Sequence, residues 1–210
     1  MKIVAFELED WEHDAFKRLE KDHEIIFTDR PITGKLADKY TDAEVISPFI
    51  YSDLDGEALQ QFRNLKLIAN RSTGFDHIDM DYCNEHDIAV CNVPVYAEET
   101  VAEHVFALLL AISHKITEAV QRTRNGNFSQ DGLEGFDLRG KTLGVIGTGN
   151  IGMNVIEIAR GFNMEVIAFD VQPDEKAASK LGFSYAGMDA LLSRADIITL
   201  HVPGNEKTRN

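Results

Sequence analysis

The most specific chemical pattern in the chain is a GxGxxG motif made by Gly147, Gly149 and Gly152. It follows the apolar run 142–146 directly and opens the run 151–162, whose spacing predicts a helix. Such a turn presents free backbone N–H groups at the positive end of a helix, where a pyrophosphate binds. We expect Gly147 to allow the tight turn, Gly149 to let the backbone approach the pyrophosphate, and Gly152 to let helix and strand pack closely. The motif predicts a dinucleotide site.

An acidic residue stands where the adenosine ribose of the dinucleotide is expected. Asp170 ends the predicted strand 165–169, 18 positions past Gly152 (170 − 152). A carboxylate there can accept hydrogen bonds from both ribose hydroxyls. A 2′-phosphate would meet a like charge at a cost of roughly 1–4 kcal/mol, and residues 171–174 contain no Arg or Lys to offset it. The sequence therefore predicts NAD rather than NADP as the cofactor.

Around this motif, short apolar runs alternate with helical patterns along the whole chain. The strands expected from this pattern are 2–6, 24–27, 45–47, 65–69, 88–91, 142–146, 165–169, 183–185 and 197–200. The expected helices are 11–21 (with Trp11, Ala15, Phe16 and Leu19 facing inward), 54–62, 79–86, 98–124, 151–162, 174–181 and 188–193. Alternation of this kind favours an α/β fold, with a parallel sheet and helices on both of its faces.

The longest expected helix, 98–124, is apolar on more than one side and ends at Gly126. A helix of that kind needs burial on most sides, because each large apolar side chain left in water forgoes roughly 1.5–3 kcal/mol. We therefore expect the helix to pass between domains and to pack against a second copy of the chain in a homodimer. The polar, glycine-containing stretch 125–140 is expected to be a loop.

Composition and charge argue against several classes of partner. The formal net charge is −14, which disfavours nucleic acid and anionic membranes, since phosphate binding depends on Lys and Arg. The most apolar run, 105–112, is too short to span a bilayer, and charge returns at Glu7, too early for a signal sequence. Cys83 and Cys91 have no metal-like or CxxC spacing and are expected to be reduced and buried. We expect a soluble cytoplasmic protein without a metal site.

Four further stretches resemble one known family. They read NRSTGFDHID at 70–79, VCNVPVY at 90–96, TVAEH at 100–104 and LHVP at 200–203. Their order and spacing around the GxGxxG motif resemble the D-2-hydroxyacid dehydrogenases across essentially the whole chain, and most closely the D-lactate dehydrogenase branch. The resemblance implies a flavodoxin-like substrate domain at 1–97 and a doubly wound Rossmann NAD-binding domain at 98–210, which would be incomplete. In this family the substrate and the nicotinamide meet in the cleft between the two domains.

The resemblance also implies a set of binding residues. The backbone N–H groups of Thr73 and Gly74 would hold the substrate carboxylate, and Phe49 and Tyr96 would line a pocket for a small substrate. On the cofactor side, the implied contacts come from Asn150, Ile151, Val202, Pro203 and Thr208, the first two at the pyrophosphate and the other three near the adenosine and the adjoining phosphate. Many relatives carry Arg where this chain has Asn150, so a charge contact is missing here while the backbone cradle is retained.

The implied reaction is hydride transfer between NADH and a small 2-oxo acid. Pyruvate and D-lactate are favoured over hydroxypyruvate or glyoxylate; phosphoglycerate is disfavoured because 47–51 holds no cation, although Arg71 leaves it open. The family's catalytic His, Glu and Arg match positions beyond Asn210. We therefore assign no catalytic residue here, read His77, His104 and His201 as structural, and expect these 210 residues alone to be inactive. An NAD(H)-sensing, non-catalytic protein of the same fold and an inactive truncated fragment remain as alternatives.

Overall fold

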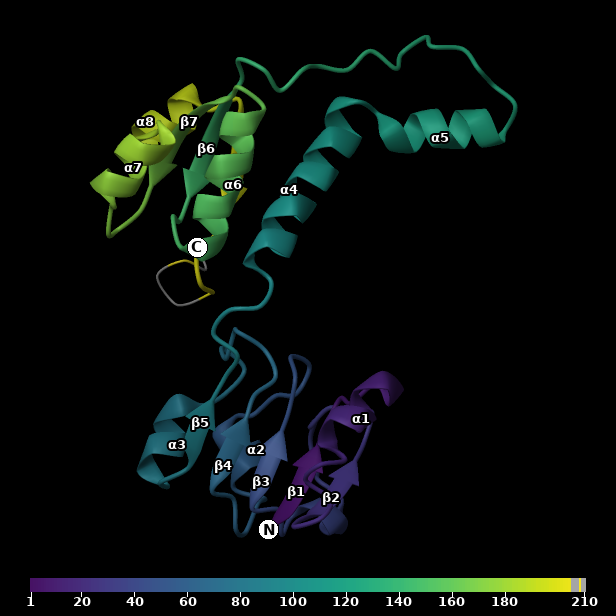
Figure 1. The fold of residues 1–210 in the computed structure, drawn as a ribbon, viewed down its shortest axis with the longest axis vertical. Helices are drawn as coiled ribbons and strands as arrows, with labels where there is room; N and C mark the ends of the chain where they lie inside the picture. Colours follow the sequence, from purple (N-terminus) through teal and green to yellow (C-terminus); the bar gives the residue numbers. More distant parts are fainter. Residues whose placement is uncertain (205–207, 209–210) are drawn as a thin grey trace. The chain divides into compact units, whose positions relative to one another are not determined.

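The computed structural model describes residues 1–204 and residue 208, and its chain forms two compact units (Figure 1). The division falls between Tyr96 and Ala97. Each unit is built on its own parallel sheet, with helices connecting the strands. The expected α/β fold is therefore confirmed.

The first unit contains a five-stranded sheet in the order β2-β1-β3-β4-β5, and all of its strand pairs are parallel. The strands are β1 (Lys2–Ala5), β2 (Glu24–Phe27), β3 (Val45–Ser47), β4 (Leu67–Ala69) and β5 (Ala89–Cys91). The connecting segments contain the 3-10 helices η1 (Asp10–Glu12) and η2 (Asp38–Tyr40) and the helices α1 (His13–Phe16), α2 (Gly56–Leu59) and α3 (Met80–Glu85).

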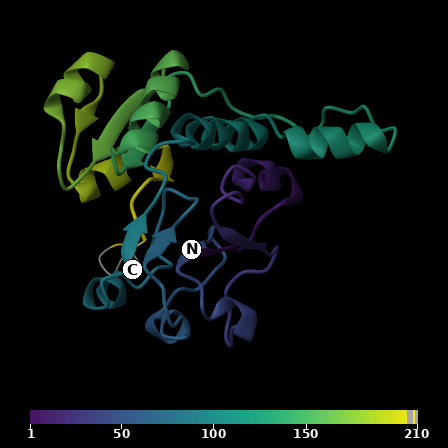
Figure 2. The ribbon, with the colours of Figure 1, turned by 60° about the horizontal axis from the view of Figure 1, so that its bottom comes forward.

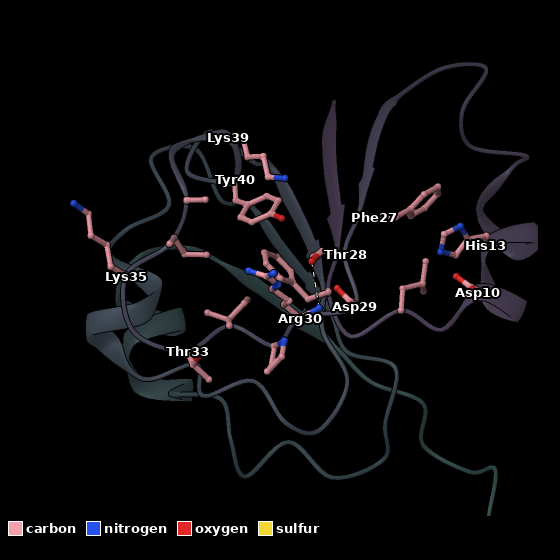
Figure 3. A pocket seen from close by; sticks show the side chains of 16 residues that line it. Asp10, His13, Phe27, Thr28, Asp29, Arg30, Thr33, Lys35, Lys39 and Tyr40 are labelled. Carbon is pink, nitrogen blue, oxygen red and sulfur yellow. Dashed lines mark hydrogen bonds between the residues drawn. The ribbon is translucent and has the colours of Figure 1, made fainter.

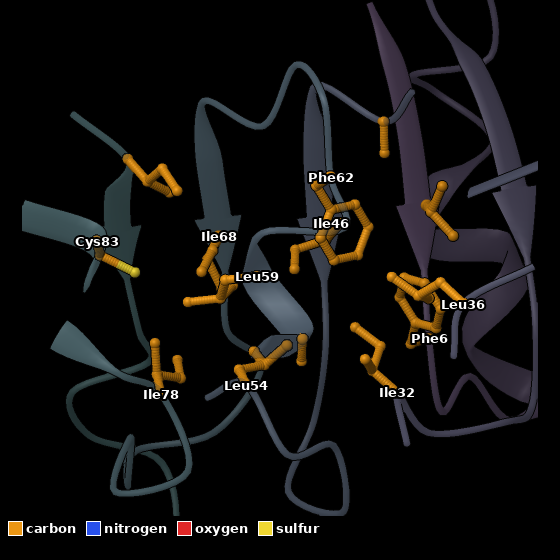
Figure 4. Packing of buried hydrophobic residues seen from close by; sticks show 14 residues of the cluster. Phe6, Ile32, Leu36, Ile46, Leu54, Leu59, Phe62, Ile68, Ile78 and Cys83 are labelled. Atoms are coloured by element: carbon orange, nitrogen blue, oxygen red, sulfur yellow. The ribbon is translucent and has the colours of Figure 1, made fainter. Parts of the chain in front are cut away.

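The core of the first unit lies between the central strands and the connecting helices (Figure 4). Val4, Ile46 and Ile68 come from β1, β3 and β4 and are fully buried, as expected for strands that are covered by other elements. Leu54 and Leu59, before and within α2, close the same cluster. Consecutive residues of β1 and β3 are buried, so these strands are covered on both faces, and their parallel pairing brings their carboxyl ends to the same end of the sheet.

The second unit has a four-stranded parallel sheet in the order β8-β7-β6-β9. Its strands are β6 (Thr142–Ile146), β7 (Glu165–Phe169), β8 (Ser184–Tyr185) and β9 (Ile197–Leu200). Its helices are α4 (Glu98–Ser113), α5 (Ile116–Arg124), α6 (Asn150–Gly161), α7 (Glu175–Leu181) and α8 (Met188–Arg194). Ala102 and Phe106 of α4 pack with Val155 and Ala159 of α6 in one buried cluster, which fixes α6 against the sheet.

The expectation of a single helix over 98–124 is wrong, because the structure has two helices there, α4 and α5 (Figures 1 and 2). Lys115, between the two helices, has a left-handed backbone with a φ of 48°. The carbonyl of Ser113 instead accepts a hydrogen bond from the N–H of Phe136, at 3.0 Å. A segment about twenty residues further along the chain therefore ends α4, and no local sequence signal marks that contact.

Two other expectations need correction. The helix expected over 11–21 is only the short pair η1 and α1, and Trp11 is 79% exposed while Ala15 is also exposed. Phe16 alone makes the expected kind of contact, edge-on to Phe27 with ring centroids 5.8 Å apart. Cys91 is exposed rather than buried, because β5 is the edge strand of its sheet, while Cys83 is buried as expected.

Gly135→Ala tests the contact that ends α4. A Cβ at position 135 would lie 1.8 Å from the carbonyl oxygen of Ser113, so the loop or the helix end must shift. We expect a loss of about 1–3 kcal/mol in the free energy of unfolding, as for other overpacked sites, measured by urea denaturation. Gly161→Ala is the matched control, because a Cβ there meets nothing within 4 Å. Equal stability of the two variants would contradict the proposed clash.

Candidate functional site

The glycine turn joins the end of β6 to the start of α6 and is packed so tightly that side chains are excluded. Gly147 has a φ of 92°, and a Cβ there would lie 2.4 Å from the carbonyl oxygen of His201, at the end of β9. A Cβ on Gly152 would lie 2.1 Å from the carbonyl oxygen of Gly147. The first and third glycines are thus required by backbone packing. The contact of Gly147 with His201 could not be read from the motif.

The middle of the turn is open. A Cβ on Gly149 would meet nothing within 4 Å, so this stretch of backbone is accessible to a ligand. Gly149 caps the twelve-residue helix α6, whose first N–H groups have no acceptor within the helix. Those of Asn150 and Ile151 therefore lie at the positive end of the helix dipole. An anion such as a pyrophosphate fits this arrangement of open backbone and free N–H groups.

Asp170, directly after β7, is held against the turn. One of its carboxylate oxygens accepts hydrogen bonds from the N–H of Thr148 at 2.6 Å and from the Thr148 hydroxyl at 3.0 Å. The other oxygen accepts from the N–H of Gln172 at 2.9 Å. The Thr148 hydroxyl also meets the hydroxyl of Tyr185 at 2.9 Å. The sequence analysis named Asp170 but missed Thr148 and Tyr185, since only the fold brings β7 and β8 beside the turn.

These hydrogen bonds control the charge of Asp170. Burial opposes its ionisation, but the backbone N–H groups of Thr148 and Gln172 and the Thr148 hydroxyl outweigh burial, so the pKa of Asp170 lies below its ordinary value. The group is therefore ionised at neutral pH. Because its pKa is lower in the folded chain, the stability it contributes is present above the ordinary Asp pKa and is lost as the pH falls through the lowered one.

The other cofactor residues expected from the resemblance lie at the same edge of the sheet or beside it. The side-chain amide of Asn150 donates to Glu98 at the start of α4, at 3.2 Å, so the residue that stands where many relatives have Arg contacts a carboxylate. Val202 and Pro203 are exposed just after β9. Thr208 is also exposed, and its hydroxyl donates to the carbonyl of Pro203.

In the first unit, the loop after β4 presents two free backbone N–H groups. The carbonyl groups of this loop accept hydrogen bonds from the protein. That of Thr73 accepts from the side-chain amide of Asn92 at 2.8 Å. That of Gly74 accepts from the Ser72 hydroxyl at 2.8 Å and from the side-chain amide of buried Asn70 at 2.9 Å. Among the hydrogen bonds of the described residues, the N–H groups of Thr73 and Gly74 donate to no protein acceptor. Two such exposed donors side by side suit a carboxylate.

Phe49 and Tyr96, expected to line the substrate pocket, come together in one cleft of about 620 Å³. Two exposed aromatic residues that the sequence analysis did not select, Trp11 and Tyr51, line the same cleft. Thr73 and Gly74 do not line it. Trp11 was missed because its spacing with Phe16 and Leu19 indicated a buried helix face. Its exposure provides the cleft with an aromatic wall.

A buried carboxylate holds the loop that carries Phe49 and Tyr51. Glu7 is only 9% exposed and has a φ of 54°. Its two carboxylate oxygens accept hydrogen bonds from the N–H groups of Tyr51 at 2.8 Å and Ser52 at 3.0 Å, and from the Ser52 hydroxyl. A longer contact of 3.4 Å joins it to the N–H of Phe49. One side chain thus accepts hydrogen bonds from three backbone N–H groups of the turn after β3.

Arg71, beside the same cleft, is occupied by the protein itself. Its guanidinium donates to the carbonyls of Ser47 at 2.6 Å and of Phe6 and Glu7 at 2.9 Å, and its Nε lies 3.4 Å from a carboxylate oxygen of Glu12. These partners tie β1, β3 and β4 together at their carboxyl ends. The side chain has little capacity left for a phosphate on a substrate.

Three histidines could suggest acid–base chemistry: His77 in the first unit, and His104 and His201 in the second. Burial lowers the pKa of His77 and of His201, so both are neutral near pH 7. The Nε2 of His201 lies 2.9 Å from the hydroxyl of Thr199 on its own strand. His104 is exposed on α4. Neither His201 nor His77 forms an ion pair with a carboxylate within the described part of the chain.

No group of three or more His, Cys, Asp or Glu side chains among the described residues is arranged to hold a metal ion. No helix in the described ranges is both long enough and apolar enough to cross a membrane.

Glu7→Gln tests whether this carboxylate positions the Phe49 loop. One oxygen becomes an amide nitrogen, which cannot accept a hydrogen bond, so at least one buried N–H loses its partner. We expect a loss of about 1–3 kcal/mol in the free energy of unfolding. Urea unfolding can be followed by the fluorescence of Trp11, the single tryptophan of the chain, which lines the same cleft. Glu20→Gln, at an exposed site, is the control; if both variants unfold at the same urea concentration, Glu7 does not hold the loop.

Comparison with known families identifies the second unit. Residues 106–210 match the profile of the NAD binding domain of the D-isomer specific 2-hydroxyacid dehydrogenases. That range contains the glycine turn and Asp170. The profile therefore coincides with the part of the chain whose geometry suits a dinucleotide.

Individual proteins agree with this match over almost the whole chain. D-lactate dehydrogenase of Escherichia coli is 36% identical over 97% of this chain and 63% of that protein, and a 2-hydroxyacid dehydrogenase homolog of Zymomonas mobilis is 33% identical over the same shares. The crystal structure of D-lactate dehydrogenase from Aquifex aeolicus, complexed with NAD and lactic acid, superimposes with a TM-score of 0.91 at 36% identity, covering 98% of this chain and 62% of that one. The chain thus spans less than two thirds of the length of these relatives. It belongs to the D-isomer specific 2-hydroxyacid dehydrogenase family.

Proposed function

We propose that the whole protein is an NAD-dependent D-2-hydroxyacid dehydrogenase that transfers a hydride between NADH and a small 2-oxo acid. The observation that supports this most strongly is the pairing of Asp170 with Thr148 beside an open glycine turn. It places an ionised carboxylate next to an anion-binding helix end, as the two parts of an adenine dinucleotide require. In this proposal the unit Ala97–Asn210 is the cofactor domain and the unit Met1–Tyr96 is the substrate domain.

The residues of the cofactor domain would hold NADH by complementary charges. The N–H groups of Asn150 and Ile151 would bind the pyrophosphate, and Asp170 would accept hydrogen bonds from the adenosine ribose in place of those it accepts from Thr148. Val202, Pro203 and Thr208 would lie near the adenosine and the adjoining phosphate. When bound, NADH supplies the hydride, and the protein supplies position and electrostatics. The ionised state of Asp170 supports NADH over NADPH, since a 2′-phosphate would be repelled.

The substrate domain would hold the acid by its carboxylate. The free N–H groups of Thr73 and Gly74 would bind it without a cationic side chain, and Phe49 and Tyr96 would line the space for the rest of the substrate. The aromatic cleft lacks a free cation among its described lining residues, because Arg71 is occupied by backbone carbonyls and Glu12. This favours pyruvate and D-lactate over a phosphorylated acid. The match to D-lactate dehydrogenases supports the same choice.

The assembly we propose is a homodimer through α4 and α5, in the cytoplasm. Val101, Leu108 and Ile112 of α4 and Ile116 and Val120 of α5 are all exposed. Large apolar side chains gathered on neighbouring helices commonly mark a protein interface. Ile112, 69% exposed, is the most exposed of them. The two free cysteines suit a reducing compartment.

Asp170→Asn tests the proposed cofactor site in the full-length protein. The amide keeps the size of the carboxylate but loses its charge and one acceptor. We expect NADH to bind about 10- to 100-fold more weakly, since a hydrogen bond to a charged group contributes roughly 1.5–3 kcal/mol. NADPH should lose much less, because the repulsion of its 2′-phosphate is removed. Both dissociation constants can be measured by the fluorescence of the reduced nicotinamide.

The matched control for that experiment is Asp189→Asn, the same change on the exposed face of α8. It should leave both dissociation constants unchanged. An Asp170→Asn variant that bound NADH like the native protein, or that kept the native ratio of NADH to NADPH affinity, would exclude Asp170 as the ribose ligand.

Ile112→Asp tests the dimer. A charge in the apolar patch should dissociate the full-length protein into monomers, as seen by analytical ultracentrifugation at micromolar concentration, because burying an unpaired carboxylate costs several kcal/mol. Leu192→Asp is the control, since Leu192 on α8 is 52% exposed but lies outside the patch. A native protein that is already monomeric, or a dimer that survives Ile112→Asp, would contradict the proposed interface.

A further inference from the structure

A second cavity lies in the first unit, next to the aromatic cleft, with which it shares Asp29 and Pro31 as lining residues. It has a volume of about 880 Å³ and is formed by the ends of β1 and β2, by η1 and by the segment 28–40 (Figure 3). Cavities of this size hold small organic ligands. None of the substrate or cofactor residues proposed above lines it. The family resemblance assigned it no role.

The charge of this cavity is opposite to that of the chain. The protein carries a net charge of −14, yet Arg30, Lys35 and Lys39 line this one space. Within the described residues, none of these three forms an ion pair with a carboxylate. The charges of these three side chains are therefore not neutralised by a protein carboxylate, and they can act on an anionic ligand.

Two of these cations converge on Tyr40. Figure 3 shows Lys39 beside the Tyr40 ring, whereas the ammonium group of Lys35 is directed away from it. The Nζ of Lys39 lies 4.8 Å from the centre of the Tyr40 ring. Burial would raise the pKa of Tyr40, but hydrogen bonds with Thr28 and Lys39 and the charges of Lys39 and Arg30 outweigh it and lower that pKa. Two positive charges thus act on the Tyr40 phenol, in addition to its hydrogen bond with Thr28.

The opposite side of the cavity carries groups that accept hydrogen bonds. Asp10 and His13 lie there, with the His13 ring packed against Phe27 at a centroid distance of 4.6 Å (Figure 3). Asp29 also lines the space. Carboxylates in this position can accept hydrogen bonds from hydroxyl groups. The cavity therefore has a cationic side that also carries a phenol, and a side that accepts hydrogen bonds.

We propose that this cavity is a binding site for a small phosphorylated polyol, with its phosphate at Arg30, Lys39 and Tyr40 and its hydroxyl groups toward Asp10 and Asp29. A guanidinium and an ammonium together match the two negative charges of a phosphate monoester, and the guanidinium matches its geometry. A phosphate alone would use only the cationic side, whereas a sugar phosphate reaches both sides. The proposal does not depend on the proposed dehydrogenase activity, and the site adjoins the aromatic cleft through Asp29 and Pro31.

The test is isothermal titration calorimetry on the full-length protein, with glucose 6-phosphate, glycerol 3-phosphate, inorganic phosphate and glucose as probes. Saturating NADH is present in a parallel series, so that binding of a phosphate at the glycine turn is recognised by its loss. We expect the phosphate esters to bind in both series, inorganic phosphate more weakly, and glucose not at all. Failure of every phosphate probe to bind, or binding that NADH abolishes, would overturn the proposal.

Variants locate the site. Arg30→Gln and Lys39→Gln should each weaken binding of the phosphate esters roughly tenfold, the loss of a charge-assisted hydrogen bond, while Arg30→Lys should retain part of the affinity. Arg18→Gln, the same loss of charge at an exposed position outside the cavity, should leave the affinity unchanged. Unfolding followed by Trp11 fluorescence checks that each variant is folded. Equal weakening by Arg18→Gln, or none by Arg30→Gln and Lys39→Gln, would show that the ester binds elsewhere.

Discussion

The carboxylate of Asp170 holds the backbone and side chain of Thr148, and through them the glycine turn keeps its shape between β6 and α6. The turn is confined on its other sides as well, because Gly152 packs on the carbonyl of Gly147 and Gly147 packs on that of His201. The ends of three neighbouring strands, β7, β6 and β9, therefore meet at one turn. This confinement leaves only Gly149 and the first N–H groups of α6 open, which is where an anion can approach.

In the first unit, too, charged side chains hold the backbone at the carboxyl ends of the strands. Glu7 and Arg71 are charged side chains whose hydrogen bonds go to the backbone of the protein, so they fix the carboxyl ends of β1, β3 and β4 rather than bind a ligand directly. What they leave accessible is a pair of N–H groups at Thr73 and Gly74 and an aromatic cleft. Both units thus present backbone donors at the ends of parallel strands, the position at which α/β sheets bind their ligands.

The sequence predicted the strands and the glycine turn well, because buried parallel strands are continuous apolar runs and the turn has a required residue type. Five strand ranges, among them 24–27 and 142–146, agree with the structure to the residue. The failures share a cause. The break at Lys115 depends on the contact of Ser113 with Phe136, and the role of Glu7 depends on Tyr51 and Ser52; these contacts join residues 23 to 45 positions apart. Hydrophobic periodicity reflects only local preferences. It therefore predicted a buried position for Trp11, which is exposed in the structure.

The most direct measurement of the central claim is a titration of the complete, folded protein with NADH and with NADPH. We expect saturable binding of NADH and at least tenfold weaker binding of NADPH, since about 1.4 kcal/mol of like-charge repulsion at Asp170 corresponds to a factor of ten. Absence of NADH binding, or equal affinity for the two nucleotides, would contradict that claim.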